Sequence, residues 1–355
     1  MKIAISVNIS LERRTGVEEY LYHLLYNLPT IDGFKEHQFF LFTPSEIEGL
    51  PKEFPIKILN WPFKGFWTQI RLSWEMRKKE YDVLFVPVHT FPLIYPRLIV
   101  TIQGLEFEKL PKMYSFWKRT LLRWMTKRNI KRAEKIIVPS KNTKNDLIKF
   151  YHTDPSKIFV VHHGVGNPKA AFDAVQTNKF GRYLLYLGRG DRRKNINGLI
   201  KAFRILKQKF QIPHKLILAG PNVGYKITKD LQKEVICTGY VKDEEKWNLL
   251  KGADVFVFPS FYEGFGIPVL EAQKVGTPVV CSSTSSMPEV VWGPNNHEPS
   301  ALLVNPYKPA EIAEAIHKII SNPNFSDELA KRGYENVQRF SWPKCAEETL
   351  SVILS

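Results

Sequence analysis

The sequence has few cysteines and no long apolar segment. Its three cysteines, Cys237, Cys281 and Cys345, lie far apart and form no CxxC pair, which argues against a disulfide framework and against a zinc site. Charge, proline or glycine interrupts every apolar run well before the roughly 18 residues that span a bilayer. The N-terminal MKIAISV resembles a strand and not a secretion signal. We therefore expect a cytoplasmic protein, with any membrane contact peripheral and on the inner face.

Acidic residues are fewer than basic residues. The 355 residues include 51 lysines and arginines but only 35 aspartates and glutamates, which gives a formal net charge of +16. Such a molecule is drawn to anions, and phosphorylated ligands, membrane surfaces and nucleic acids all qualify. The chain is longer than the size at which a single core stops growing, so its length predicts two domains.

Short β-branched or aromatic runs alternate with segments of helical period along the chain. The strand-like runs are KIAISV, DVLFVP, RLIVTI, KIIVPS and KIFVV, and then YLLYLG, LILAG, VICTG, DVFVFPS, TPVVC and ALLVN. This alternation predicts an α/β fold in which helices wrap two Rossmann-like parallel sheets. The pattern pauses at residues 164–179, so we assign one domain to 1–170 and another to 171–340. Residues 341–355 should form a helix with Ser341 as its N-cap and Pro343 in its first turn.

The segment from Asp254 to Cys281 carries the clearest functional signal. It consists of a buried strand, a glycine-containing loop, a helix opened by Pro268 and a second buried strand. In open α/β sheets, ligands bind at the carboxyl ends of strands, where helix N-termini present unpaired N–H groups. The amides of Phe265, Gly266 and Ile267 can therefore point toward a diphosphate.

Two carboxylates bracket this turn. The two oxygens of Glu271 match the vicinal hydroxyls of a ribose, and Glu263 in the loop can face a transferred sugar. The alternative is that Glu271 is a solvated helix residue and Glu263 an ordinary loop charge. The strand, loop and helix around them favour the ligand-binding interpretation.

A cluster of cations follows the strand that ends at Gly188. The loop carries Arg189, Arg192, Arg193 and Lys194 just before a helix that should span about Asn195 to Phe210. Positive charge at the carboxyl end of a strand stabilises a leaving diphosphate as its negative charge develops. The alternative is a solvated basic loop. In the first half, Gly16 stands at a loop-to-helix junction, which is a weak signal because GxGxxG is absent.

Seven stretches together resemble the family 4 glycosyltransferases over nearly the whole chain. They are TGVEEY, VPSKNTKNDL, VHHGV, LGRGDRRKN, EGFGIPVLE, SMPEVV and ALLVNP. The resemblance implies the GT-B fold, with two Rossmann-like domains whose parallel sheets face each other across a cleft. It implies that 1–170 binds the acceptor, that 171–340 binds the nucleotide-sugar donor, and that the helix 341–355 packs back on the first domain.

The resemblance also implies roles for individual residues. Arg189 and Lys194 would hold the donor diphosphate and, with Glu263, form the catalytic group. The substrate-binding residues would be Gly16, Val17, Gln103, Phe265, Gly266, Ile267 and Glu271. The family is generally considered to retain anomeric configuration through front-face attack assisted by the leaving phosphate. It usually needs no metal and no further cofactor.

One position departs from the family pattern. Many members have His-Asp after the strand that corresponds to RLIVTI, whereas this chain has Gln103-Gly104. Glutamine can donate a hydrogen bond to a sugar hydroxyl but cannot be a cation. TGVEEY and PEVV are most similar to the mannosyltransferase branch, so we expect transfer of a hexose, mannose from GDP-mannose, to a glycan, lipid-linked or other envelope acceptor. A GT-B sugar-nucleotide epimerase and an inactive homologue are the alternatives.

Most of the excess positive charge of the first half lies in one segment. Residues 109–135 contain ten basic residues and one acidic residue. Met113, Trp117, Leu121 and Trp124 or Met125 recur at helical spacing among them, a pattern typical of helices that lie on anionic lipid headgroups. The alternative is that the apolar face packs on the sheet while the basic face is solvated. We do not expect nucleic-acid binding, the remote alternative, because no motif for it is present.

Overall fold

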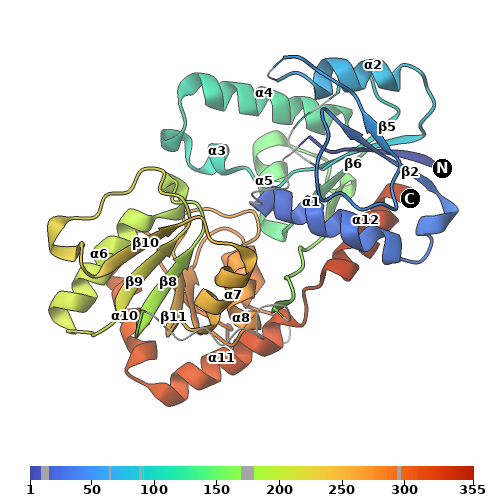
Figure 1. Cartoon of the computed structure of the whole chain (residues 1–355). Helices are drawn as coiled ribbons and strands as arrows, with labels where there is room; N and C mark the ends of the chain where they lie inside the picture. The colour runs from blue at the N-terminus through green and yellow to red at the C-terminus, as the bar shows by residue number, and fades with distance from the viewer. Residues whose placement is uncertain (9–15, 64, 88–89, 91, 169–179, 294–296) are drawn as a thin grey trace. The chain divides into compact units, whose positions relative to one another are not determined.

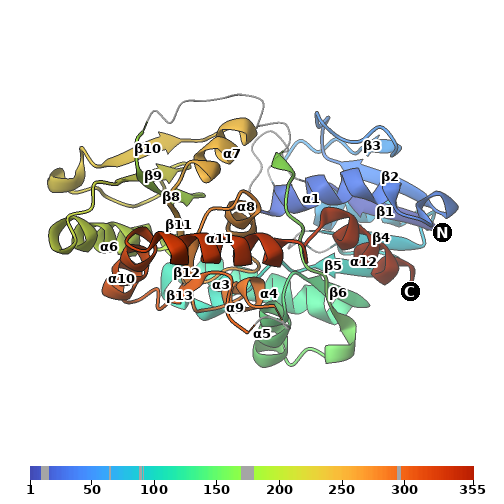
Figure 2. The ribbon, with the colours of Figure 1, turned by 90° about the horizontal axis from the view of Figure 1, so that it is seen from below.

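The computed structural model describes residues 1–8, 16–63, 65–87, 90, 92–168, 180–293 and 297–355. These residues form two compact units, one of 1–164 with 340–355 and one of 165–339. Each unit is an α/β structure with one parallel sheet (Figures 1 and 2). The boundary expected between residues 170 and 171 falls within 169–179, which lies outside the described residues.

The first unit has, in its described part, a sheet of seven strands in the order β3-β2-β1-β4-β5-β6-β7. All neighbouring strands are parallel. The strands are β1 (Lys2–Ser6), β2 (Gln38–Thr43), β3 (Ile56–Ile58), β4 (Val83–Val86), β5 (Arg97–Thr101), β6 (Lys135–Val138) and β7 (Ile158–Val160). Five of them confirm the predicted runs, and β2 and β3 extend the sheet beyond these. The central β4 is buried along its whole length, which explains its continuous apolar sequence.

The helices of the first unit include one from the end of the chain. They are α1 (Gly16–Asn27), α2 (Ser73–Met76), α3 (Glu106–Lys109), α4 (Phe116–Arg132), α5 (Lys141–Tyr151) and α12 (Trp342–Leu354). Ser341 caps α12 by accepting a hydrogen bond from the amide of Lys344 at 3.3 Å, which confirms the predicted cap. No helix within the described ranges has the length and apolar content needed to cross a bilayer.

Residue 164 must be glycine for α12 to begin where it does. A Cβ atom at Gly164 would lie 2.2 Å from the backbone nitrogen of Trp342. The ring of Trp342 in turn stacks on His23 of α1, with 4.7 Å between ring centroids. At its other end, α12 accepts a hydrogen bond from the amine of Lys135 in β6 at the carbonyl of Val352. These contacts join the last helix to the first unit.

The second unit contains, as far as it is described, six parallel strands in the order β10-β9-β8-β11-β12-β13. They are β8 (Tyr183–Leu187), β9 (Lys215–Ala219), β10 (Val235–Gly239), β11 (Val255–Phe258), β12 (Val279–Ser282) and β13 (Leu302–Val304). All six confirm the runs predicted for this half. The helices are α6 (Ile196–Lys209), α7 (Asp243–Lys251), α8 (Ile267–Lys274), α9 (Met287–Val291), α10 (Pro309–Ile320) and α11 (Pro323–Val337).

The strand order of the second sheet reverses between β8 and β11. From β8 the chain moves outward through β9 and β10, whereas from β11 it moves the other way through β12 and β13. Ligands of open α/β sheets bind outside the carboxyl ends of the strands at such a reversal, because the two connecting loops diverge there. The loops that begin at this point are 188–195 after β8 and 259–266 after β11.

Candidate active site

The loop after β8 is fastened to two other strand ends by one side chain. Asn195 adopts a left-handed backbone conformation with φ of 58°, which asparagine tolerates better than most residues. Its side-chain amide donates hydrogen bonds to the carbonyls of Pro259 after β11, at 3.1 Å, and Pro306 after β13, at 2.6 Å. The amide of Phe261 also donates to the carbonyl of Arg193. The two loops at the strand reversal are therefore held in fixed relation.

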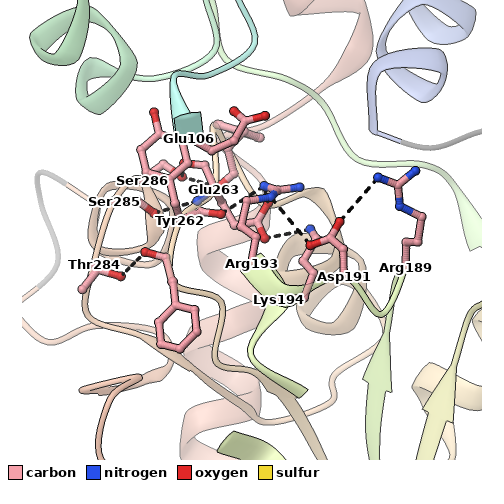
Figure 3. A network of polar contacts seen from close by, with 12 residues as sticks. Glu106, Arg189, Asp191, Arg193, Lys194, Tyr262, Glu263, Thr284, Ser285 and Ser286 are labelled. Atoms are coloured by element: carbon pink, nitrogen blue, oxygen red, sulfur yellow. Dashed lines mark hydrogen bonds and ion pairs between the residues drawn. The ribbon is translucent and has the colours of Figure 1, made fainter. Parts of the chain in front are cut away.

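Two cations of this loop meet Glu263. The Lys194 amine lies 2.7 Å from one carboxylate oxygen of Glu263, and the Arg193 guanidinium lies 3.1 Å from the other (Figure 3). Arg193 also donates to the carbonyl of Tyr262. The side chains of Lys194 and Glu263 are only 13% and 8% exposed. Glu263 is thus not a solvated loop charge, and this alternative is wrong.

The buried pair holds opposite charges in a site that water hardly reaches. Burial opposes ionisation of Glu263, but the charges of Lys194 and Arg193 outweigh it and lower the pKa of the carboxyl below its ordinary value. Burial also lowers the pKa of Lys194, which the neighbouring carboxylate only partly offsets. The cluster therefore presents an ionised carboxylate between two cationic side chains.

A serine-rich turn after β12 shapes the loop that carries Glu263. The Ser285 hydroxyl accepts a hydrogen bond from the amide of Glu263, and the Ser286 hydroxyl donates to the carbonyls of Glu263 and Phe265 (Figure 3). The Thr284 hydroxyl donates to the carbonyl of Phe261. Sequence reasoning did not select these three residues, although the SMPEVV stretch begins at Ser286. The signal was the run of small hydroxyl residues between strand and helix.

The N-terminus of α8 adjoins this loop. Gly266 precedes the helix with φ of 121°, a conformation that strongly favours glycine, and it supplies no capping side chain. The first turn of α8 contains no acidic residue, so the positive end of the helix dipole is not neutralised by a side chain of its own. Phe265, Gly266 and Ile267 therefore occupy a helix N-terminus suited to an anion.

Glu271 lies further along α8 and is also buried. Its carboxylate is 2.7 Å from the amine of Lys246, which comes from α7. The Lys246 amine also lies 3.4 Å from Asp243 and 5.0 Å from the ring centroid of Trp247. The alternative of a solvated Glu271 is therefore wrong as well. Sequence reasoning missed Lys246, because nothing in the spacing relates it to Glu271.

Arg189 is separate from the Glu263 cluster. Its guanidinium is 59% exposed and lies 3.6 Å from Asp191, which is itself 4.0 Å from Arg193 (Figure 3). The structure thus brings Lys194 and Arg193, but not Arg189, into contact with Glu263. Arg192 is exposed, as a solvated loop residue would be.

The remaining candidate residues belong to the first unit. Gly16 and Val17 begin α1, and Gln103 follows β5. Val17 packs against the core of that unit, whereas Gly16 is exposed and has no atom within 4 Å of the position of a Cβ. The side-chain amide nitrogen of Gln103, Nε2, is buried and has no hydrogen-bond partner within the described segments. A buried unpaired donor of this kind is suited to a ligand oxygen.

The structure contains, over the ranges it describes, no group of three or more histidine, cysteine, aspartate or glutamate side chains arranged to hold a metal ion. The charged side chains that meet here are those of Arg193, Lys194 and Glu263, and the first turn of α8 follows the loop of Glu263.

Two family models match successive parts of the chain. The model described as Glycosyltransferase Family 4 matches residues 14–166, and the model described as Glycosyl transferases group 1 matches residues 169–336. The second match contains both loops of the candidate site and Glu271.

Two mannosyltransferases are similar in sequence over most of the chain. O-antigen chain mannosyltransferase B of Escherichia coli is 26% identical over 299 residues, which cover 79% of this chain and 76% of that protein. O-antigen chain mannosyltransferase RfbU of Salmonella typhimurium is 25% identical over 307 residues, which cover 83% and 82% of the two chains.

Solved structures are similar over the full length. WaaG, a glycosyltransferase involved in lipopolysaccharide biosynthesis, aligns with a TM-score of 0.77 at 16% identity and 99% coverage of both chains. Anabaena HepE in complex with UDP-glucose aligns with a TM-score of 0.72 at 17% identity, also with 99% coverage of both. These likenesses establish the two-sheet GT-B architecture.

Proposed function

Because this chain belongs to the family 4 glycosyltransferases and has the GT-B fold, we propose that it transfers a hexose from a nucleotide diphosphate sugar with retention of anomeric configuration. Mannose from GDP-mannose is the first choice, supported by relatives that are named mannosyltransferases. A nucleotide-sugar donor is further supported by HepE, which was solved with UDP-glucose. The acceptor would be a glycan, a lipid-linked sugar or another envelope component, as in polysaccharide biosynthesis on the cytoplasmic side.

The observation that carries this proposal is the meeting of Lys194, Arg193 and Glu263 beside the N-terminus of α8. A diphosphate gains negative charge as it leaves the sugar, and fixed cations and helix N–H groups stabilise that charge without reorganising. The partly exposed Arg189 lies in the same loop and can join them when a diphosphate is present. The second unit would therefore be the donor domain.

The reaction follows from what each group can do. An acceptor hydroxyl oxygen forms a bond to the anomeric carbon, the bond from that carbon to the β-phosphate oxygen breaks, and the acceptor proton passes to the leaving phosphate. Glu263 accepts hydrogen bonds from hydroxyls of the transferred hexose, and Glu271 accepts them from the ribose. Gly16, Val17 and Gln103 would contribute from the first unit, which we assign to the acceptor.

The test is release of nucleoside diphosphate from GDP-mannose and from UDP-glucose without acceptor, followed by sugar analysis of the recovered donor. We expect slow release from the true donor. An epimerase would change the sugar without release, and an inactive homologue would do neither. Either result would overturn the proposed transfer.

Chelation tests whether a metal takes part. Because side-chain cations and a helix N-terminus can supply the positive charge that a metal would otherwise provide, we expect release of nucleoside diphosphate to continue unchanged in excess EDTA. A loss that added Mg²⁺ or Mn²⁺ restores would contradict the metal-free reaction.

We also propose that the enzyme meets its acceptor at an anionic membrane surface through residues 109–135. Support comes from the exposure of Trp117, Leu121 and Trp124 on the basic helix α4. Tryptophan and cations together are typical of surfaces that lie at the level of lipid headgroups.

A further inference from the structure

The apolar residues that the sequence singled out on α4 point away from the first unit. Trp117, Leu121 and Trp124 are 80%, 54% and 47% exposed, and their spacing places them on one face of the helix. The opposite face, with Leu122 and Ile130, packs against the core of the unit. The alternative in which the tryptophan face packs on the sheet is therefore wrong.

The same outward face becomes cationic toward the end of the helix. Arg128 and Lys131 continue the spacing of Trp117, Leu121 and Trp124 along α4. Both are exposed, as is Lys127 beside them. One strip of α4 thus changes from aromatic to basic along its length.

Two arginines of α4 form ion pairs within the first unit. Arg119 and Arg123 lie 3.2 Å and 2.9 Å from the buried carboxylate of Glu108, which also accepts a hydrogen bond from the Tyr151 hydroxyl. This anchors the helix on α3 and α5. By contrast, Lys127, Arg128 and Lys131 form no ion pair with any described acidic residue, so their charge remains available to a ligand.

These free cations line a cavity of about 640 Å³. Its lining consists of Tyr95, Trp124, Lys127, Arg128, Lys131 and Arg132, without an acidic residue. Arg132 is held at the rim by a 3.0 Å hydrogen bond to the carbonyl of Pro92 and lies over the ring of Tyr95. Arg128 lies over the ring of Trp124. Aromatic rings thus lie against two guanidinium groups of the cavity, and two lysines complete its cationic lining, which suits a phosphate.

A second exposed apolar element adjoins this cavity. Leu93 and Ile94, immediately before Tyr95, are 49% and 41% exposed, and the backbone amide of Leu93 donates a 2.7 Å hydrogen bond to the hydroxyl of Ser73 in α2. The next residue of α2, Trp74, is 67% exposed. Figure 1 draws α2 and α4 along the same side of the first unit. Exposed apolar side chains therefore precede the cavity residue Tyr95, and the segment that carries them is hydrogen-bonded to α2, which exposes Trp74.

We propose that the cavity binds the phosphate headgroup of an anionic phospholipid in a bilayer, while Trp117, Trp74 and their apolar neighbours enter the headgroup boundary. The charged residues that line the cavity are all cationic. This charge complementarity and the exposed apolar side chains beside it favour a lipid surface over a soluble partner. The proposal assigns a membrane partner to the proposed glycosyltransferase. It rests on the proposed function only for the purpose that membrane binding would serve, because the binding itself requires neither donor nor acceptor.

The experiment is co-sedimentation of the full chain with vesicles of phosphatidylcholine alone and with added phosphatidylglycerol. We expect binding only when phosphatidylglycerol is present. The double variant Lys127→Glu with Lys131→Glu should weaken it by at least about tenfold, because each basic residue near such a surface contributes measurably. Trp117→Ala should weaken it as well, through loss of an apolar contact with the headgroup boundary.

Two controls carry the same change in charge. Lys112 and Lys118 are exposed near or within the same helix but outside the cavity, and Lys201 and Lys233 are exposed in the second unit. Reversing the second pair should have no effect, and reversing the first should cost clearly less than reversing Lys127 and Lys131. Equal losses for both α4 pairs would overturn the cavity as a headgroup site.

Other outcomes are equally decisive. Failure of the unaltered chain to bind phosphatidylglycerol vesicles, or tighter binding to a single-stranded oligonucleotide at the same salt concentration, would overturn the proposal. Release of nucleoside diphosphate without vesicles should be the same in all these variants. A chain that binds vesicles but turns over no donor would refute the proposed reaction and leave the headgroup site standing.

Discussion

The two regions of concentrated positive charge in this protein are built in opposite ways. Around Glu263, Lys194 and Arg193 are shielded from water and paired with a carboxylate at 2.7 Å and 3.1 Å. On α4, Lys127, Arg128 and Lys131 are exposed and pair with no acidic residue among those described. Charges held in a fixed buried geometry suit one ligand in one orientation. Exposed charges on mobile side chains suit an extended anionic surface and are screened by salt.

Removing the carboxylate from the buried region should have the largest effect. Glu263→Gln removes the carboxylate that pairs with Lys194 and Arg193 and that would face the transferred sugar, so we expect turnover to fall roughly 100- to 1,000-fold. The free energy of unfolding should fall by about 3 kcal/mol, because the Lys194 amine, only 13% exposed, loses its partner. Nucleoside diphosphate affinity should change less than turnover. Steady-state kinetics, calorimetry with GDP and thermal unfolding measure the three quantities.

The matched control is Glu314→Gln, which removes a carboxylate from an exposed pair with Lys209 and should leave all three quantities unchanged. Unaltered turnover in Glu263→Gln would contradict a catalytic role for the buried basic region, which is what distinguishes it from the basic region on α4.

The next largest effect should come from the other buried carboxylate. Glu271→Ala removes the proposed ribose acceptor, so we expect GDP to bind about 1.5–3 kcal/mol more weakly. Lys246→Ala removes only the partner that Glu271 has in the structure and should affect GDP affinity less. Calorimetry on both variants separates a ligand contact from a structural ion pair. Equal losses in the two would argue that Glu271 only holds α7 against α8.

The pH dependence of stability and of activity should reflect the shifted pKa values of Glu263 and Lys194. Since the folded-state pKa of Glu263 lies below 4.5, its contribution to stability is fully present above 4.5 and is lost as the pH falls through the lower folded value. Since the pKa of Lys194 is also lowered, activity on the alkaline side should begin to fall below pH 10.5. Thermal unfolding and initial rates across pH measure both limits. An alkaline limit that Lys194→Arg leaves in place would contradict the assignment to Lys194.

The smallest effect should come from Asp191, which lies between Arg189 and Arg193. Its carboxylate occupies cations that a diphosphate would need, so Asp191→Asn should tighten GDP binding by a few-fold, within the 0.2–1 kcal/mol typical of exposed pairs at about this distance. Calorimetry at two salt concentrations measures the change. Weaker binding would mean that Asp191 positions the arginines instead of competing for them.

Much of the fold could be predicted from the sequence because it depends on local periodicity. Eleven predicted strand runs, the helix from Ile196 to Lys209 and the cap at Ser341 were all confirmed. The strands β2 and β3 were not predicted. Ile56 and Ile58 lie in a three-residue edge strand that gives little pattern, whereas the six-residue β2 was missed although its run QFFLFT favours a strand. Sequence position alone also located the two loops of the candidate site, because a loop that follows a buried strand of a parallel sheet must lie at its carboxyl edge.

Only the tertiary structure decided which side chains meet. Four cations occur between Arg189 and Lys194, and loop spacing cannot tell that Arg193 reaches Glu263 while Arg189 reaches Asp191. Lys246 and Glu271 come from different helices, and no local pattern relates them.

On α4 the sequence by itself determined that Trp117, Leu121 and Trp124 share a face, since helical spacing requires it. It did not determine whether that face is buried, because Leu122 and Ile130 place apolar side chains on the other face as well. The face with Leu122 and Ile130 packs against the core, and the ion pairs of Arg119 and Arg123 with Glu108 stabilise this orientation. Periodicity fixes which residues lie together, whereas burial depends on contacts with segments distant in the sequence.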